Sequence, residues 1–352
     1  MGKNQGLKAK GDALRVIGFH QAAIDCLDSA GAEFLQVGEE ENWASSRISW
    51  ILAAAWLGRV DEALQEAKRA HEVFIRIGQP YWACMVDNNT ALIYDYIGRY
   101  QDALILYDQM LTVYRTLPEQ SDQSIKRAIA MAECNQAIEL AVLGHFEDAY
   151  RLQQQARASF IALNETSCVI STEMNLADLD YTQGYYGSAL RHYYDALDVI
   201  DQNEIDEPPL LALFKLWMAN CLMKLNRIQE ACQLAEEAVA IQRKLDMSLQ
   251  KSNALREYAT ILIASGNLQQ ALTTLDETRV LFSNGKLHYY AAITELQQAE
   301  VQLAMGHAAE AYERAYRLKA YFDAQNLVAR SVNAAIVMAS ALIAIGQTED
   351  IR

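Results

Sequence analysis

The sequence predicts an all-α protein, a right-handed superhelical solenoid of about nine helix-turn-helix repeats. Two observations predict this fold class. Hydrophobic residues make up 52% of the chain and there are only four prolines, which suits a soluble helical protein. One short pattern also returns at a nearly fixed spacing, six steps being of 40 residues, one of 46 and one of 42, and such a period indicates a repeat array. The pattern is centred on Gly18, Gly58, Gly98, Gly144, Gly184, Asn226, Gly266, Gly306 and Gly346.

Each block is expected to hold two helices joined at this central residue. The position five residues later is always alanine in the complete blocks: Ala23, Ala63, Ala103, Ala149, Ala189, Ala231, Ala271 and Ala311. The position seven residues earlier is small in all blocks except that of Ile51: Gly11, Ala91, Ala137, Ala177, Ala219, Ala259, Ala299 and Ala339. Small side chains let two helix backbones approach closely, and glycine accepts the left-handed conformation that ends the first helix. Every block therefore predicts a helical hairpin.

Short linkers between the hairpins carry helix breakers, at Gly78–Pro80, Leu117–Pro118, Glu207–Pro209 and Ser283–Gly285. The 46-residue step predicts an insertion at Pro118–Ser124, and the 42-residue step predicts a smaller one at Asp201–Glu207. Insertions in solenoids emerge on one edge and can bind partners. The acidic second insertion lacks the glycine and ligand spacing of a calcium loop, so a solvated linker is the preferred interpretation there.

The last block supplies a first helix, expected over Val332–Ile345, but only six residues follow its turn. Because solenoids normally finish with a polar capping helix, we expect an incomplete last repeat, a fragment of a larger protein, and possible oligomer formation through this apolar helix. A solenoid needs only burial between neighbouring repeats, so residues 1–352 are expected to form a single solenoid domain.

Two stretches show the pattern most plainly: Ile51–Leu64, ILAAAWLGRVDEAL, and Ala91–Leu104, ALIYDYIGRYQDAL. They resemble tetratricopeptide repeats, and the resemblance runs from about Lys8 to Ile351. The standard repeat of that superfamily has 34 residues, so each unit here is about six residues longer. Extended repeats of this kind resemble those of large bacterial regulators, including maltose-activator-type regulators and the arms of CHAT (caspase-like) proteases. The resemblance implies a concave groove, lined by the first helix of each hairpin, that binds a peptide or protein segment.

Polar residues at matched positions of the first helices are the candidate groove residues: Asn88, Asn89, Asp95, Asn135, Asn175, Asp178, Tyr181, Asn220, Arg256, Glu257 and Glu300. Asparagine offers both a donor and an acceptor, so a row of asparagines suits the backbone of a bound segment. The alternative is that the asparagines bond to neighbouring helices and fix the pitch of the array. The sequence pattern agrees with both interpretations. The superfamily's carboxylate clamp needs Lys and Arg, for which only Arg256 and Lys224 are available, so a receptor for chaperone tails is not expected.

Charge and composition argue against other classes of function. The net charge of −15 disfavours a nucleic-acid groove, and the most apolar run, Ala334–Ile345, is too short for a membrane span. The first residues lack a secretory signal, so a cytoplasmic location is expected. Six scattered cysteines and six histidines form no ligand or catalytic motif, which predicts no metal, no cofactor and no enzymatic activity.

Four tryptophans crowd the second and third hairpins, at Trp43, Trp50, Trp56 and Trp82. Aromatic side chains at helical spacing are usually core residues, and two exposed together would instead mark a binding hot spot. The sequence therefore predicts a protein-interaction scaffold. The alternative is a regulatory or sensor arm of a larger effector, such as a CHAT caspase-like protease or a STAND-type regulator.

Overall fold

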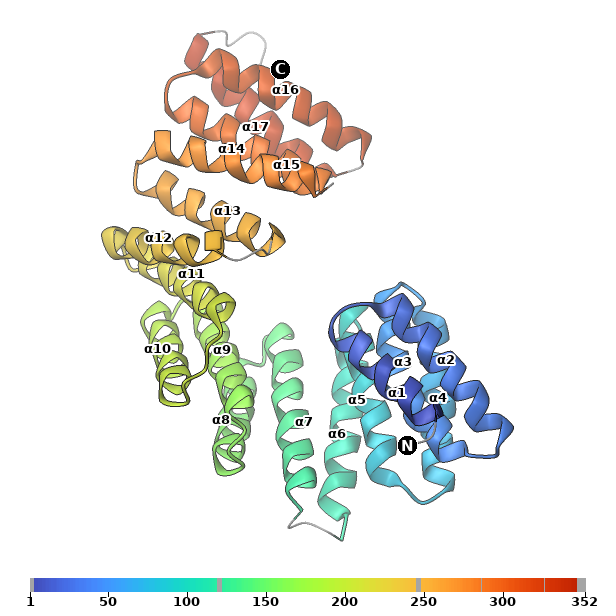
Figure 1. Cartoon of the computed structure of the whole chain (residues 1–352). Coiled ribbons are helices and arrows are strands. Elements are labelled where there is room, and N and C mark those ends of the chain that lie inside the picture. The colour runs from blue at the N-terminus through green and yellow to red at the C-terminus, as the bar shows by residue number, and fades with distance from the viewer. Residues whose placement is uncertain (1–2, 119–121, 245–247, 286, 326, 347–352) are drawn as a thin grey trace. The chain divides into compact units, whose positions relative to one another are not determined.

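The computed structural model describes residues 3–118, 122–244, 248–285, 287–325 and 327–346, and within them the chain forms seventeen α-helices (Figure 1). The helices are α1 Lys3–Val16, α2 His20–Gln36, α3 Glu40–Trp56, α4 Val60–Arg76, α5 Pro80–Tyr96, α6 Tyr100–Thr116, α7 Gln123–Val142, α8 Phe146–Ala162, α9 Thr166–Thr182, α10 Tyr186–Gln202, α11 Pro208–Lys224, α12 Ile228–Lys244, α13 Ser248–Ala264, α14 Leu268–Asn284, α15 His288–Ala304, α16 Ala308–Ala324 and α17 Val328–Ile345. The predicted all-α repeat solenoid is confirmed.

The period of 40 residues arises from two helices of 17 residues, each followed by a turn of three. The turn after α3 shows how each helix ends. Gly58 has a φ of +80°, and the amide of Arg59 donates to the carbonyl of Ala54 at 3.0 Å, which satisfies one of the last carbonyls of the helix. Asn226 takes the same left-handed conformation with a φ of +59°, which explains why asparagine replaces glycine in that block.

The small residues lie where the helices cross. Ala63 and Ala103 on the second helices, and Ala91 and Ala177 on the first, are fully buried. A larger side chain at these points would meet the facing helix, because protein interiors are close-packed. The burial of these alanines agrees with the predicted reason for the pattern, which remains a prediction.

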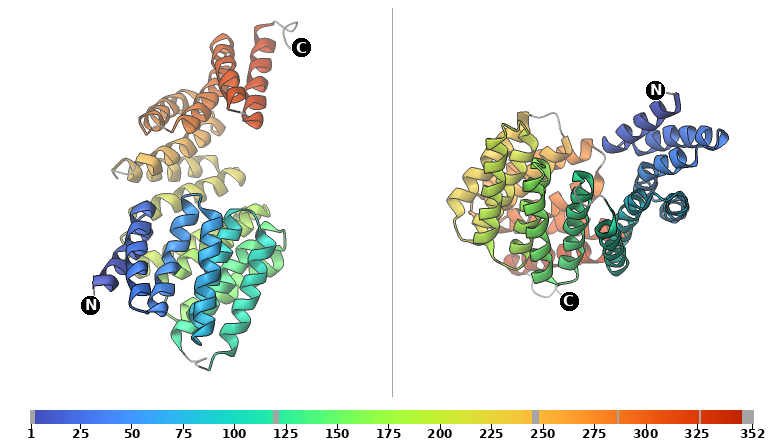
Figure 2. Two further views of the ribbon diagram at one scale, coloured as in Figure 1. Left: turned by 90° about the vertical axis from the view of Figure 1, so that its right-hand side faces the viewer. Right: turned by 90° about the horizontal axis from the view of Figure 1, so that it is seen from below.

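The chain divides into two compact units, Met1–Leu179 and Asp180–Arg352. In the first unit α1 contacts α3, α3 contacts α5, and α5 contacts α7, so the first helices of the hairpins form one row. In the second unit α11 contacts α13 and α15 contacts α17 in the same way. Figure 2 shows successive antiparallel helices packed side by side within each unit. The sequence-based expectation of one domain over the whole chain remains a prediction.

In the first unit, ion pairs join each second helix to the first helix of the next repeat. His71 Nδ1 lies 2.8 Å from Asp87 Oδ1, and Arg157 pairs with Glu173 in the same way two repeats later. In the first such junction the polarity is reversed. The guanidinium of Arg47 occupies the space over Gly31, where a Cβ atom would lie 2.5 Å from its Nη2, and donates to Asp28 at 2.8 Å. Consecutive repeats are thus held by paired charges as well as by apolar contact.

The two longer steps have different structural results. Residues 119–121 of the first insertion lie outside the described residues, and α7 begins at Gln123, where the carboxylate of Asp122 accepts from the Ser124 amide at 2.6 Å. The resulting α7 has 20 residues instead of 17. The second insertion lies between α10, which ends at Gln202, and α11, which begins at Pro208, as predicted.

The C-terminal helix is longer than the sequence pattern indicated. We expected it to begin at Val332, but α17 begins at Val328, because the preceding turn closes at Leu327 with the bond Leu327 N to Phe322 O of 2.9 Å. The helix has 18 residues, so it is also longer than the apolar run Ala334–Ile345 that we judged too short for a span. By length and composition alone this helix of the described chain could cross a membrane, with a mean hydropathy of 1.8, and 28% of it is buried.

The four N-terminal tryptophans divide into two pairs. Trp43 and Trp50 are buried, each 3% exposed, as expected for core residues. Trp56 and Trp82 are about two-fifths exposed, which the core interpretation did not predict. Trp56 ends α3 and packs edge-on against Tyr96 at 4.9 Å between centroids, whereas Trp82 lies at the start of α5 beside Tyr81 at 5.4 Å. Because Tyr96 and Tyr81 belong to opposite ends of α5, the exposed tryptophans do not form one hot spot.

Candidate binding groove between α5 and α7

All of the sequence-predicted groove residues lie on first helices of their hairpins. In the first unit, Asn88, Asn89 and Asp95 are on α5, Asn135 is on α7, and Asn175 and Asp178 are on α9. In the second unit, Tyr181 is on α9, Asn220 on α11, Arg256 and Glu257 on α13, and Glu300 on α15. The structure thus places Asn88, Asn89, Asn135 and Asn175 on successive first helices of the first unit.

The asparagines of the first unit bond from one repeat to the preceding one. Asn89 donates to the backbone carbonyl of Ile48 at 2.6 Å, and Asn135 donates to the side-chain oxygen of Asn88 at 3.2 Å. Asn175 donates to Cys134 Sγ at 3.4 Å. In all three cases the residue nine places before the turn reaches the residue ten places before the preceding turn. We call this series the asparagine ladder.

The asparagine ladder gives the asparagines a structural role. Asn89 is only 7% exposed and its amide is used by Ile48, which leaves it little capacity for a ligand. Asn88 and Asn135 are half-buried, so each keeps polar atoms near the surface. The interpretation as pitch-setting contacts therefore has direct geometric support, while peptide binding by these residues remains a prediction.

In the second unit the predicted residues mostly meet their own neighbours. Tyr181 packs edge-on against Tyr186 at 5.2 Å between centroids, and Arg256 pairs with the adjacent Glu257 at 3.2 Å. Asn220 is half-buried and Glu300 is exposed. These contacts do not bring the five residues together at one place.

A cavity of about 200 Å³ lies between α5 and α7, over α6, in the first unit. It is lined by Tyr81, Met85 and Asn88 of α5, Met110 and Tyr114 of α6, and Ser124, Arg127, Ala128 and Met131 of α7. The lining is mostly apolar, and the flexible methionines can adapt to differently shaped side chains. The polar groups at its edge are Asn88 and the guanidinium of Arg127, which pairs with Glu165 at 2.8 Å.

This cavity lies where the longer insertion changes the spacing of the array. A second hollow of about 440 Å³ adjoins it at the starts of α5 and α7 and shares Tyr81 and Ser124 with it. The second hollow is lined by Gly78, Gln79, Pro80, Leu117, Pro118, Asp122 and Ile125 as well. The insertion therefore borders an opening at one end of the space between the two helices, which we call the α5–α7 groove.

The floor of the α5–α7 groove is one face of α6. Tyr114, Met110 and Tyr107 are spaced so that they share this face, and all three are buried. Because α6 runs antiparallel to α5, Tyr114 lies near the cavity at the start of α5, and its ring centroid is 5.8 Å from that of Tyr81. Tyr107 lies farther along α6, beyond the residues that line the cavity.

Acidic groups lie farther along α5 and α7, beyond the residues that line the two hollows. Glu139 of α7 is 2% exposed, and its Oε2 has no hydrogen-bond partner among the described residues. Burial, together with the charge of Asp95 on α5, raises the pKa of Glu139 to about 7. Burial raises the pKa of Asp95 too, and the buried hydroxyl of Tyr107 interacts with the side chain of Asn135.

Glu139 was missed by sequence reasoning, although a signal for it exists. It lies five residues before the turn, where the other blocks carry Ala13, Ala53, Ile93, Leu179, Cys221, Ile261, Val301 and Ala341. A charged residue at a position that is otherwise apolar is costly unless it is paired or used. That single departure from the pattern would have identified Glu139.

The thiols nearest the groove are poor nucleophiles. Burial raises the pKa of Cys84 to about 12 and that of Cys134 to about 11, so both are thiols at neutral pH. All six cysteines are described as free.

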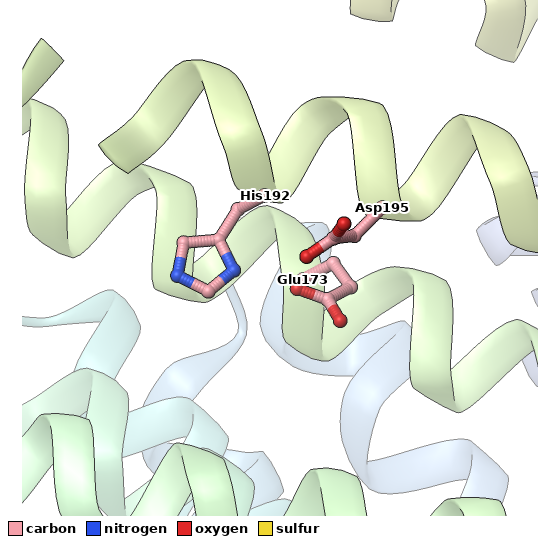
Figure 3. Close-up of side chains that lie close together, drawn as sticks. All are labelled: Glu173, His192 and Asp195. Carbon is pink, nitrogen blue, oxygen red and sulfur yellow. The ribbon is translucent and has the colours of Figure 1, made fainter. Parts of the chain in front are cut away.

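Three side chains elsewhere are of the types that bind metal ions. Figure 3 shows these side chains, Glu173 on α9 with His192 and Asp195 on α10. Glu173 pairs with Arg157 within the first unit, and His192 lies 3.6 Å from Asp180 within the second unit. Glu173 belongs to the first unit and the other two residues belong to the second, so the three are not assigned to one metal site.

Comparisons with known proteins show the fold. Neither protein-family models nor curated proteins give a match. Among solved structures, a STAND protein with a tetratricopeptide repeat sensor from Pyrococcus horikoshii matches with a TM-score of 0.66 and 13% identity, over 93% of this chain and 49% of that one. The apo quorum sensor NprR from B. thuringiensis matches with a TM-score of 0.60 and 16% identity, over 99% and 95%. A Rap protein complexed with Competence and Sporulation Factor matches with a TM-score of 0.57 and 11% identity, over 99% of both chains. The chain thus has the fold of tetratricopeptide-like solenoids, and the predicted resemblance is confirmed at that level.

Proposed function

We propose that this chain is a non-enzymatic receptor for a segment of protein, which it binds in the α5–α7 groove. The observation that carries the proposal is the cavity lined by methionines and tyrosines between two first helices, with Asn88 at its edge. An apolar cavity with a few polar groups at the rim is the usual form of a binding site. The free cysteines and acidic composition fit a cytoplasmic receptor, which is part of the proposal.

The structural neighbours support a regulatory use of such binding. NprR is a quorum sensor, the Rap protein was solved in a complex with Competence and Sporulation Factor, and the STAND protein carries its repeats as a sensor. Because this chain matches 49% of the STAND chain, a second candidate is a sensor arm of a larger effector. In that case the bound segment would be another part of the same polypeptide.

The experiment is a screen of the whole chain against an array of immobilised dodecapeptides, followed by affinity measurement on the peptides that bind. Ala128 lines the cavity, so Ala128→Trp should fill it and reduce the affinity at least about tenfold. The matched control is Ala158→Trp, on the exposed face of α8, which should bind like the parent chain. Thermal melting of both variants shows that they fold.

The outcome that would overturn the proposal is equal loss, or no loss, in the two variants. A crosslinking map separates the two candidates, because a sensor arm would crosslink to a segment of its own polypeptide. A scaffold would crosslink to a separate protein.

A further inference from the structure

Buried acids on the first helices of the first unit generally have a cation supplied by the chain. Glu133, which is on the same helix as Glu139, pairs with Arg115 at 3.0 Å, and Glu173 pairs with Arg157. Glu139 differs from both. Its Oε2 is buried and has no hydrogen-bond partner among the described residues. Burial and the charge of another acid, Asp95, raise the pKa of Glu139, and no cation lowers it.

The asparagine ladder fixes where this carboxylate lies. Asn135 meets Asn88, so one turn further along α7 Glu139 lies between that point and Asp95 on the parallel helix α5. Tyr107 reaches the same place from α6 below. Burial and the charges of Glu139 and Asp95 raise the pKa of its hydroxyl, and its side chain also bonds to Asn135. Asp95 is half-buried, which makes it the rim of the site, with Glu139 and the Tyr107 hydroxyl at the base.

A buried carboxylate whose Oε2 has no hydrogen-bond partner among the described residues is costly for the folded protein. A guanidinium or ammonium group would satisfy this carboxylate, because it donates hydrogen bonds and carries the opposite charge. Arg99, the first arginine after α5, already has an acidic partner. It pairs with Asp102 at 2.7 Å and lies over the ring of Tyr94.

We propose that the base formed by Glu139, Asp95 and Tyr107 is a subsite for a lysine or arginine side chain of the bound protein segment. This inference rests on the proposed function and names the chemistry of the ligand. Ten residues separate Met85 from Asp95 along α5, which corresponds to about 15 Å. An extended segment rises about 3.3 Å per residue, so the ligand has a bulky apolar residue and, about four or five residues away, a basic one.

The first test uses the small cation n-butylguanidinium as the probe, added to the full chain with carbon-13-labelled glutamate side chains. Saturable binding should move the Glu139 carboxyl signal and lower its apparent pKa, while neutral 1-pentanol should do neither. Glu139→Gln both assigns the signal and should abolish the saturable effect. Glu133→Gln is the matched control, since that acid has its own internal cation, and it should keep the effect.

The second test uses a peptide from the array that binds, and its copy with the basic residue replaced by norleucine. The replacement should weaken binding to the parent chain at least about tenfold and leave binding to Glu139→Gln nearly unchanged. Tyr107→Phe, which keeps the ring, should lie between the two.

The outcomes distinguish this inference from the proposed function. If peptides bind in the groove but the norleucine copy binds the parent chain equally well, the receptor stands and the basic subsite is wrong. If no peptide binds, butylguanidinium still decides the subsite, and an equal response of the parent chain and Glu139→Gln overturns it.

Discussion

Glu139 is a carboxylate placed in a core position between Asp95 of α5 and Tyr107 of α6. Its pKa is about 7 in the folded chain, against an ordinary value of 4.5. Between these values the folded protein holds a proton that the unfolded chain has lost. The contribution of Glu139 to stability is therefore complete below pH 4.5 and is lost as the pH rises through 7.

Glu139→Gln should remove this pH dependence. Relative to the parent chain, the variant should gain stability from pH 5 to pH 8, by up to about 3 kcal/mol, because a buried charge no longer forms. Urea unfolding at four pH values measures the difference. Glu147→Gln, at an exposed site on α8, is the control, and parallel curves for parent and Glu139→Gln would contradict the assignment.

The asparagine ladder also makes a prediction at the scale of single residues. Asn89→Ala should cost about 1–2 kcal/mol of unfolding free energy, because it removes a buried hydrogen bond to Ile48. Asn135→Ala should cost less, since that side chain is half-buried, and should weaken peptide binding if it also contacts the ligand. Chemical denaturation of both variants tests the order, and a larger cost for Asn135→Ala would reverse the account of the ladder.

At the scale of helices, the close crossings depend on alanine. Ala103 is fully buried, so Ala103→Leu should overpack the junction and cost about 1–3 kcal/mol. Ala158→Leu, on the exposed face of α8, should cost little. Denaturant midpoints compare the two, and equal midpoints would mean that the crossing tolerates larger side chains.

The turns provide a second prediction at this scale. Glu204 has a φ of +50° in the turn after α10, a conformation that disfavours a residue with a Cβ atom. Glu204→Gly should raise the unfolding free energy by about 0.5–1 kcal/mol, despite the entropy that glycine adds to the unfolded chain. Gly78→Ala, at the equivalent turn with a φ of +73°, should act in the opposite direction. Thermal melting checks both signs.

The helices and turns were predictable from the sequence because each depends on local chemistry. The glycines mark left-handed turns, and the alanines mark crossings. The partner of Asn89 and the unpaired state of Glu139 were not predictable, since they depend on which side chains face one another across repeats. The predicted start of α17 was wrong for a related reason. The apolar pattern begins at Val332, but the turn before the helix closes at Leu327.

At the scale of the whole molecule, a repeat array is stabilised by contacts between neighbouring repeats. A local defect should therefore weaken its own unit most. Four of the five tryptophans, Trp43, Trp50, Trp56 and Trp82, belong to the first unit, and Trp217 belongs to the second.

Fluorescence can follow the two units separately. In Trp217→Phe the remaining tryptophans report the first unit, and Ala103→Leu should lower the denaturant midpoint that they show. In a chain that keeps Trp217 alone, the same substitution should move the midpoint less. Identical shifts in the two backgrounds would show that the array unfolds as one cooperative block.

The segment between α10 and α11 contains the two additional residues outside any helix, and the alternation of 17-residue helices resumes after it. One residue added inside a helix would instead rotate every later side chain of that helix by about 100° about its axis. A change of length is thus accommodated in a connecting segment, or at the end of a helix as in the 20-residue α7, and not in the middle of a helix. A fluorescent reporter or an affinity tag is best inserted beside Asp206, between α10 and α11, where it does not rotate the side chains of either helix.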